Sequence, residues 1–267
     1  METWRLIDSG TCAAAFNMAL DESIATVVRK EGSPPTLRLY GWDRPSLSIG
    51  SFQKVSEINI DYCKERGIPI VRRPTGGRAI LHEKELTYSF SVRTVGGPFS
   101  HGLLDSYRRI GVVFNLAFGK IGVLHADTKK RRERGEVLNG SPLCFQSSSF
   151  GEILIENKKA MGSAQKRWND GLLQQGSIPY EVNEEEICAV FRLKTTAVLR
   201  ESMTVLKEAV PGLNEDVFKN MVTASFAETF DVSLVSSLPS PEELSLAREL
   251  EERKYHQSCW NLHREVR

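Results

Sequence analysis

The chain has 267 residues, and its 35 basic side chains nearly balance its 34 acidic ones, leaving a formal net charge of +1. A chain of this length can bury a sizeable core, and its neutral balance is not typical of proteins dedicated to nucleic acids or membrane surfaces. Its five widely spaced cysteines include no CxxC pair and no apolar run reaches about 18 residues, so we expect a cytoplasmic protein without disulfides, structural zinc or a membrane span.

Periodicity predicts helices and strands that alternate along the first two thirds of the chain. Helical spacing of apolar residues predicts helices over 16–29, 61–66 and 103–118. Strands are expected over 36–40, 47–52, 68–72, 86–91, 150–155, 160–165 and 172–178. In 86–91 apolar and polar residues alternate, which is the pattern of a half-buried strand. From about 184 onward the chain turns mostly helical.

Strands grouped early and helices grouped late favour the α/β (α+β) class. We expect a single domain over residues 1–267, with a mixed, mostly antiparallel sheet flanked by helices and a C-terminal helical part over about 184–267. A dense run of basic residues, 129–134, has no apolar face. We interpret it as a mobile, solvated loop, with a docking patch for an acidic carrier protein as the alternative.

The segment Arg72-Arg73-Pro74-Thr75-Gly76-Gly77-Arg78 follows an apolar run that ends at Val71. Adjacent glycines let the backbone approach a ligand closely, and the arginines supply fixed positive charge, so the segment suits an anion or a carbonyl group. It matches neither a Walker motif nor GxGxxG, and a tight turn explains the glycines equally well. His82, shortly after it, is a candidate base or a packed, hydrogen-bonded histidine.

Cys144 is the candidate nucleophile, because a cysteine thiolate attacks acyl carbons and the resulting thioester can acylate an amine. It lies between a charged loop and a predicted strand, where reactive groups often occur, although an ordinary small hydrophobic residue would also fit there. The other cysteines are expected to be packing residues or bystanders: Cys12, Cys63, Cys188 and Cys259.

Lys159 is the candidate cation that would favour the thiolate or bind a developing oxyanion. The small residues Gly162-Ser163-Ala164 follow it and would leave room for a substrate beside the ammonium group. A solvated lysine on a hairpin is the alternative.

Several segments in a fixed order resemble signature segments of the lipoate ligase, octanoyltransferase and biotin ligase superfamily. They are Arg72-Arg73-Pro74-Thr75-Gly76-Gly77 with Leu81-His82, Lys159-Ala160-Met161-Gly162-Ser163-Ala164-Gln165, Thr3-Trp4-Arg5 with Ile7-Asp8-Ser9-Gly10, Phe16-Asn17-Met18-Ala19-Leu20-Asp21-Glu22, Tyr40-Gly41-Trp42, and Trp260-Asn261. Within the superfamily the chain most resembles the cysteine-dependent octanoyltransferases. The resemblance spans nearly the whole chain and implies a fold like the biotin and lipoate ligase catalytic domains.

The resemblance assigns roles to individual residues. It implies that Cys144, in a Cys-Phe pair, carries the acyl group and that Lys159 contacts the acyl carbonyl. The substrate-binding residues that we expect on the same basis are Arg73, Gly76, Gly77, Arg78, His82, Ser89, Gly162, Ser163 and Ala164. The pocket would be walled by the strands that carry Arg73, Ser89 and Ala164. Arg78 stands where ATP-using lipoate ligases usually have a small residue, which favours a transferase.

The implied reaction transfers octanoate from octanoyl-acyl carrier protein to a lysine of a lipoyl-domain protein, in lipoate biosynthesis. The acceptor would be the glycine cleavage H protein or a 2-oxoacid dehydrogenase E2 subunit. No metal, nucleotide or other cofactor is expected, because the incoming thioester is already activated. The alternatives are an ATP-dependent lipoate-protein ligase, an amidotransferase between lipoyl domains, and a non-catalytic module that binds acylated carriers. The general base is open, with His82 as the candidate.

Overall fold

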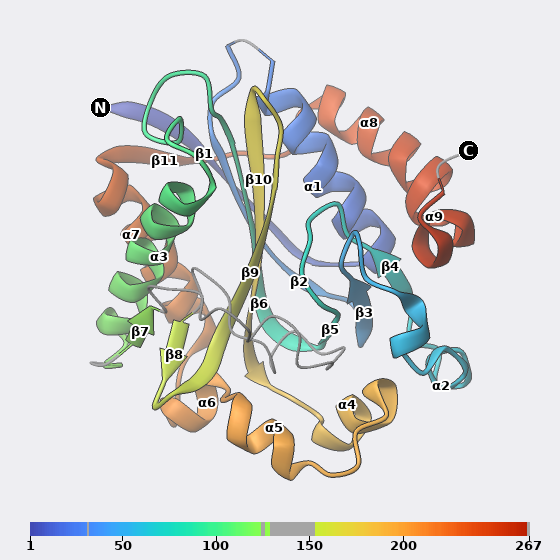
Figure 1. Cartoon of the computed structure of the whole chain (residues 1–267). Coiled ribbons are helices and arrows are strands. Elements are labelled where there is room, and N and C mark those ends of the chain that lie inside the picture. Colours follow the sequence, from blue (N-terminus) through green and yellow to red (C-terminus); the bar gives the residue numbers. More distant parts are fainter. Residues whose placement is uncertain (31, 124–125, 129–152, 266–267) are drawn as a thin grey trace.

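The computed structural model describes residues 1–30, 32–123, 126–128 and 153–265 (Figure 1). Within these residues the main sheet has eight strands, in the order β11 (Val232–Ser236), β1 (Glu2–Cys12), β2 (Thr36–Trp42), β6 (Lys84–Arg93), β10 (Gly171–Glu181), β9 (Lys158–Arg167), β8 (Ile153–Ile155) and β7 (Ala126–Thr128). β1 pairs parallel with β11 and β2, and the other neighbours are antiparallel. The prediction of a mixed, mostly antiparallel sheet is confirmed.

Helices cover both faces of the main sheet. α1 (Ala14–Val28) packs with α8 (Pro241–Leu250) on one face, and α3 (Leu103–Lys120) packs with α7 (Glu215–Phe230) on the other (Figure 1). Apolar side chains such as Tyr88, Phe90, Phe114 and Phe226 fill the layer beneath α3 and α7. The predicted α/β class with flanking helices is therefore confirmed.

A second, smaller sheet lies beside α1 and carries much of the arginine and glycine segment. Its strand order is β4 (Ile70–Arg72), β3 (Ser46–Ile49) and β5 (Ile80–His82). Its apolar side packs against α2 (Ile60–Glu65), α4 (Glu184–Phe191) and α5 (Ala197–Ser202). The segment 73–79 therefore connects two strands of this sheet and faces the main sheet (Figure 1).

The remaining short helical segments lie in the C-terminal part, apart from a 3-10 turn at Val55–Glu57. They are α6 (Leu206–Ala209), a π-helical turn at Glu251–Tyr255 and α9 (Ser258–His263). In the part of the chain that the structure describes, no helix is long and apolar enough to cross a bilayer.

β6 differs from its predicted exposure. The alternation over 86–91 is present, but the polar face is also buried, since Thr87 is 3% exposed and Ser89 is 2% exposed. α1 covers this face. Hydrogen bonds satisfy two of its hydroxyl groups, as Thr87 donates to Glu85 and Ser89 donates to Asp21 at 2.6 Å, whereas the Ser91 hydroxyl is buried without a partner among the described residues. The period-two alternation therefore separates an apolar buried face from a polar buried face, and over these residues neither face of β6 is exposed to solvent.

Three strands of the main sheet, β1, β7 and β11, had no counterpart in the predicted elements. β1 follows the chain's start, and β11 interrupts the part that was predicted to be mostly helical. β11 has only five residues and forms an edge of the sheet, where its pairing partner β1 is more than 200 residues away in the sequence. The segment predicted as a strand over 47–52 ends earlier, at Ile49, because the chain turns at Gly50.

Candidate functional site

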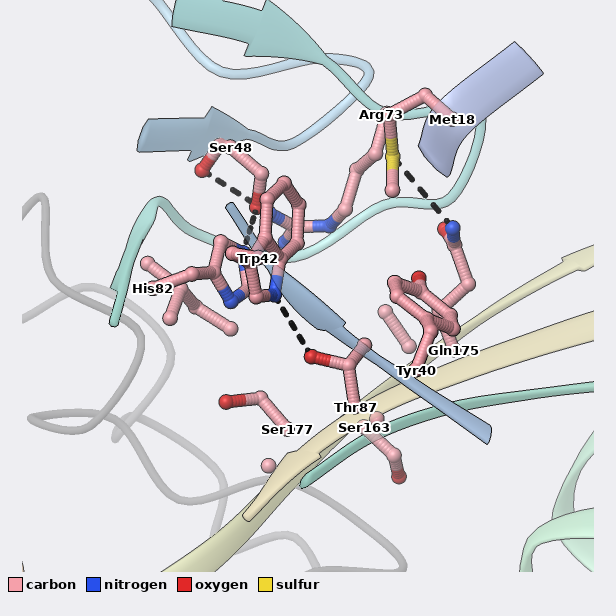
Figure 2. A pocket seen from close by; sticks show the side chains of 14 residues that line it. Met18, Tyr40, Trp42, Ser48, Arg73, His82, Thr87, Ser163, Gln175 and Ser177 are labelled. Atoms are coloured by element: carbon pink, nitrogen blue, oxygen red, sulfur yellow. Dashed lines mark hydrogen bonds between the residues drawn. The ribbon is translucent and has the colours of Figure 1, made fainter. Parts of the chain in front are cut away.

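A pocket lies between the main sheet and the small sheet, and Figure 2 shows the side chains that line it. The main sheet contributes small side chains, an amide and two aromatic rings, and the small sheet with its connecting segment contributes Ser48, Ile80, His82 and Arg73. The lining residues are Met18, Tyr40, Trp42, Ser48, Arg73, Ile80, His82, Thr87, Gly162, Ser163, Ala164, Gln175, Gly176 and Ser177. The lining is mostly apolar in area and has a few fixed polar groups, which is the usual composition of a small-molecule site.

Arg73 holds the glycine segment in shape. Its guanidinium donates to the carbonyl oxygens of Gly76 at 2.7 Å and Arg78 at 2.7 Å, and to the Ser48 hydroxyl at 3.1 Å. The side chain is 5% exposed, so a positive charge is fixed within the pocket wall. A lysine could not reproduce this planar set of donors.

Arg72 has a different task from its neighbour. Its side chain donates to the carbonyl oxygens of Gly50 at 2.9 Å and Trp260 at 3.1 Å, while the Trp260 indole donates to the Arg72 carbonyl at 2.9 Å. The Asn261 side chain accepts from the Arg72 backbone N–H at 2.9 Å. These bonds hold α9 against β4. They show that the two sequence segments Trp260-Asn261 and Arg72-Arg73, which are far apart in the chain, are in direct contact in the fold.

The glycine segment approaches β3 closely. A Cβ atom added at Gly50 would lie 1.8 Å from the carbonyl oxygen of Gly77, so only glycine fits at position 50. Gly77 has a φ of 86°, in the left-handed region that favours glycine. The tight passage of the two backbones sets the distance between Arg73 and the pocket.

His82 is the centre of a buried hydrogen-bond chain. Its Nε2 lies 2.7 Å from the Ser48 hydroxyl and its Nδ1 lies 2.8 Å from a Glu85 carboxylate oxygen. The Trp42 ring stacks on the imidazole, with centroids 4.0 Å apart and 13° between the planes (Figure 2). The ring is therefore held at both nitrogens and on one face.

Glu85 is a buried carboxylate with many donors. Ser177 donates to it at 2.9 Å, and Thr87 and His82 donate to the other oxygen. Burial alone would raise the pKa of Glu85, but the neighbouring His82 and the hydrogen bonds from His82, Thr87 and Ser177 lower it overall. The carboxylate thus remains an anion behind the pocket wall.

A second buried carboxylate, Asp21, supports the other end of the pocket. It accepts hydrogen bonds from Arg38, Tyr40, Ser89 and Gln175. Gln175 accepts in turn from Thr75 at 2.8 Å, so the glycine segment is tied to α1 through the floor of the pocket. Burial, followed by the nearby Asp21 charge, raises the pKa of Tyr40 well above its ordinary value.

Lys159 lies beside a β-bulge at the start of β9. Ile153 pairs with Met161 and Leu154 pairs with Lys159, so Ala160 is the extra residue, and bulges redirect neighbouring side chains. Lys159 is 2% exposed, and its carbonyl accepts from the Thr204 N–H at 3.1 Å. The burial of Lys159 differs from the solvated hairpin lysine that was the alternative, but Lys159 is not among the pocket's lining residues, so its contact with an acyl carbonyl stays a prediction.

Cys144 lies outside the described residues, and so does the basic run 129–134. Among the described cysteines, burial raises the pKa of the Cys63 thiol to about 11 and also raises the pKa of Cys12 and Cys188. Each of these three is therefore a poor thiolate at neutral pH. Cys63 packs in the core of the small sheet, in agreement with the expected packing role.

The structure brings most of the predicted binding residues together. Arg73, His82, Gly162, Ser163 and Ala164 line the pocket. Gly76, Gly77 and Arg78 form the adjoining segment that Arg73 holds, with Gly76 facing a neighbouring cleft. Ser89 lies behind the wall, bonded to Asp21, and Thr87 occupies the β6 position at the pocket itself.

Sequence reasoning missed the residues that surround His82 and Gln175. Ser48, Thr87, Gln175 and Ser177 were not singled out as site residues, although all four line the pocket. A signal was present for Thr87, because β6 carries the polar residues Glu85, Thr87, Ser89 and Ser91 at alternate positions, which is too regular for an apolar core. Within the described residues, no group of three or more His, Cys, Asp or Glu side chains could hold a metal ion.

The comparisons with known proteins agree with this architecture. Residues 13–227 match the family model of the lipoyl protein ligase A/B catalytic domain. Octanoyltransferase LipM of Anoxybacillus flavithermus is 35% identical over 275 residues, covering 98% of this chain and 99% of that protein. The LipM octanoyltransferase of Geobacillus kaustophilus is 36% identical over 283 residues, with the same coverage of 98% and 99%.

A solved structure confirms the fold independently. A bi-partite lipoate protein ligase from Thermoplasma acidophilum, described with its E2 lipoyl domain, superposes with a TM-score of 0.84 at 24% identity, covering 100% of this chain and 99% of that one. At this identity the likeness concerns the fold alone. Given the family match over most of its length and these full-length relatives, the chain belongs to the lipoyl protein ligase A/B catalytic domain family.

Proposed function

We propose that the chain is an octanoyltransferase of lipoate biosynthesis that carries the acyl group on Cys144. The observation that supports this most directly is the pocket between the two sheets, lined by Gly162, Ser163 and Ala164 of the strand that also carries the buried Lys159, in a chain about 35% identical along its length to LipM octanoyltransferases. Residues 1–267 act as one catalytic domain in this scheme, and the reaction takes place in the cytoplasm.

The pocket suits a slender acyl chain. Gly162 and Ala164 keep one wall thin, while Met18, Trp42 and Ile80 provide apolar surface. Each methylene that leaves water contributes about 0.8 kcal/mol, so an eight-carbon chain gains several kcal/mol in such a channel. Asp21 and Thr75 hold Gln175 in place, so the pocket has a rigid polar boundary. An alkyl chain that passed this boundary would break buried hydrogen bonds, which costs free energy.

The reaction proceeds through two acyl transfers. The Cys144 thiolate attacks the carbonyl carbon of the octanoyl thioester on acyl carrier protein, and the carrier's thiol leaves. The amine of a lipoyl-domain lysine then attacks the octanoyl-cysteine thioester, which forms the amide and releases the Cys144 thiolate. The ammonium of Lys159 stabilises the oxyanion in both steps, an effect typically worth a few kcal/mol.

The residues around the pocket have distinct tasks in this scheme. Arg73 fixes the segment of Gly76, Gly77 and Arg78 over the acyl chain, and His82, Ser163 and Ala164 border it. Ser89 acts indirectly, through Asp21. The acceptor is a lipoyl domain, such as the glycine cleavage H protein or an E2 subunit.

A transfer assay without ATP tests the proposal. The purified chain is mixed with octanoyl-acyl carrier protein and a lipoyl domain, and the mass of the lipoyl domain is followed. We expect octanoylation without ATP, and loss of it in a Cys144→Ala variant. Octanoylation that instead requires ATP and free octanoate would establish a ligase, and transfer only from an octanoylated lipoyl domain would establish an amidotransferase.

A further inference from the structure

The hydrogen-bond chain through His82 has a single consistent direction. Glu85 is an anion that accepts from Ser177 and Thr87, so the proton in its contact with His82 resides on Nδ1 of the imidazole. In the tautomer with the ring proton on Nδ1, Nε2 of His82 is an acceptor, and the Ser48 hydroxyl, 2.7 Å away, donates to it. The order of donors is therefore Ser48 to His82 to Glu85.

Arg73 completes the polarisation of this chain. Its guanidinium donates to the Ser48 oxygen at 3.1 Å and uses one of the two acceptor positions of that hydroxyl. The second acceptor position of Ser48 is available to a donor from the pocket, which Ser48 and His82 both line. A serine hydroxyl oriented by a histidine and a carboxylate is a general arrangement for moving a proton.

We propose that Ser48, His82 and Glu85 form the proton relay that deprotonates the attacking amine in the second half of the reaction. This role rests on the proposed octanoyl-cysteine intermediate. The neutral lysine of the lipoyl domain attacks the thioester carbonyl, which gives a tetrahedral intermediate with a positively charged nitrogen. That nitrogen passes one proton to the Ser48 oxygen, and the Ser48 proton moves to Nε2 of His82.

The step is balanced without a further reactant. The C–N bond forms, the C–S bond breaks, the Cys144 thiolate leaves, and the proton from the amine ends on His82. The resulting imidazolium lies 2.8 Å from the Glu85 carboxylate, which stabilises it until the proton passes to solvent or to the thiolate. His82 thus accepts the proton, while Glu85 acts through it as a positioning residue.

The surroundings of His82 favour this cycle between a neutral and a charged ring. Glu85 on β6 accepts at Nδ1 of the ring, and Arg73 donates to the Ser48 hydroxyl that lies at Nε2. Trp42 covers one face of the ring. The Arg73 guanidinium stays protonated throughout the cycle and takes no part in the proton transfer.

The test separates the two half-reactions. The enzyme is loaded from octanoyl-acyl carrier protein and freed of donor, and the decay of the acyl-enzyme is then followed by intact mass after addition of a lipoyl domain. We expect loaded Ser48→Ala and His82→Gln enzymes to transfer about 100-fold more slowly than loaded wild type, or worse, as is typical when a proton acceptor is lost. Glu85→Gln should move the rise of the transfer rate with pH to lower pH.

A matched control is provided by the other histidine–glutamate pair. His256 lies 3.2 Å from Glu251 in an exposed position and does not line the pocket, so His256→Gln should leave both half-reactions unchanged. Transfer at the wild-type rate by loaded Ser48→Ala and His82→Gln enzymes would overturn the relay. If His82→Gln cannot be loaded with octanoate, the transfer rate of loaded Ser48→Ala decides whether the relay exists. If Ser48→Ala cannot be loaded either, a transfer rate of Glu85→Gln that depends on pH as in wild type overturns the relay. Wild type that never loads would instead refute the acyl-enzyme, and the relay with it.

Discussion

Replacing Asp21 by asparagine should destabilise the protein strongly, although the change removes no side-chain volume. Asp21 is completely buried and ion-paired with the completely buried Arg38 at 2.7 Å. One carboxylate oxygen accepts from Arg38 and Ser89, and the other accepts from Tyr40 and Gln175. An asparagine NH₂ group would face two donors in either orientation, and Arg38 would keep an uncompensated buried charge.

Breaking a buried ion pair in this way costs about 3–5 kcal/mol. For a domain of this size that loss lowers the melting temperature by on the order of 10 °C. Urea unfolding followed by tryptophan fluorescence measures the free energy of unfolding. Asp8→Asn is the matched control, because the pair of Asp8 with Lys219 is exposed and should be worth no more than about 1 kcal/mol. Equal losses in the two variants would refute the reasoning.

Three further predictions follow from the packing and the pKa values. Gly50→Ala should cost at least about 1–3 kcal/mol in unfolding experiments, because the added methyl group meets the backbone of Gly77 at 1.8 Å and no rotamer relieves the contact. Ala164→Leu should fold but lose octanoyl loading, measured by intact mass, whereas Ala197→Leu on exposed α5 should load normally. Stability should fall as pH rises from about 9 toward about 11, because the folded state keeps the Cys63 proton that the unfolded chain releases, and Cys63→Ala should flatten that decline in pH-dependent urea titrations.

The sequence predicted the elements whose periodicity is local. Helices α1, α2 and α3 and strands β2, β4, β6 and β10 begin and end within a few residues of the expected bounds. β11 escaped prediction because a five-residue edge strand has too little pattern of its own and forms only when β1 is present beside it. The division into a large and a small sheet is likewise a property of long-range pairing, which periodicity does not encode.

The sequence predicted those site residues that belong to one contiguous motif. It did not predict site residues that come from separate segments and meet only in the folded chain. Arg73, His82 and Gly162 to Ala164 belong to contiguous segments and do line one pocket. Ser48 comes from a strand that meets His82 only in the fold, so nothing in its local sequence marks their contact, whereas the contact of His82 with Glu85, three residues later, is local. The sequence also gives no reason to assign different roles to Arg72 and Arg73. The hydrogen bonds in the structure do so, because Arg72 binds the backbone of α9 and Arg73 binds Ser48 at the pocket.

The most direct test of the central claim is the intact mass of the protein after mixing with octanoyl-acyl carrier protein in the absence of ATP. The thioester mechanism predicts one octanoyl adduct on the wild-type chain that hydroxylamine removes. It also predicts no such adduct on Cys144→Ser, while Cys63→Ala, altered at a buried cysteine, still forms it. Two results would contradict the assignment of the acyl group to Cys144. One is a hydroxylamine-labile octanoyl adduct that persists in Cys144→Ser. The other is a wild-type chain that octanoylates a lipoyl domain but never forms an octanoyl adduct.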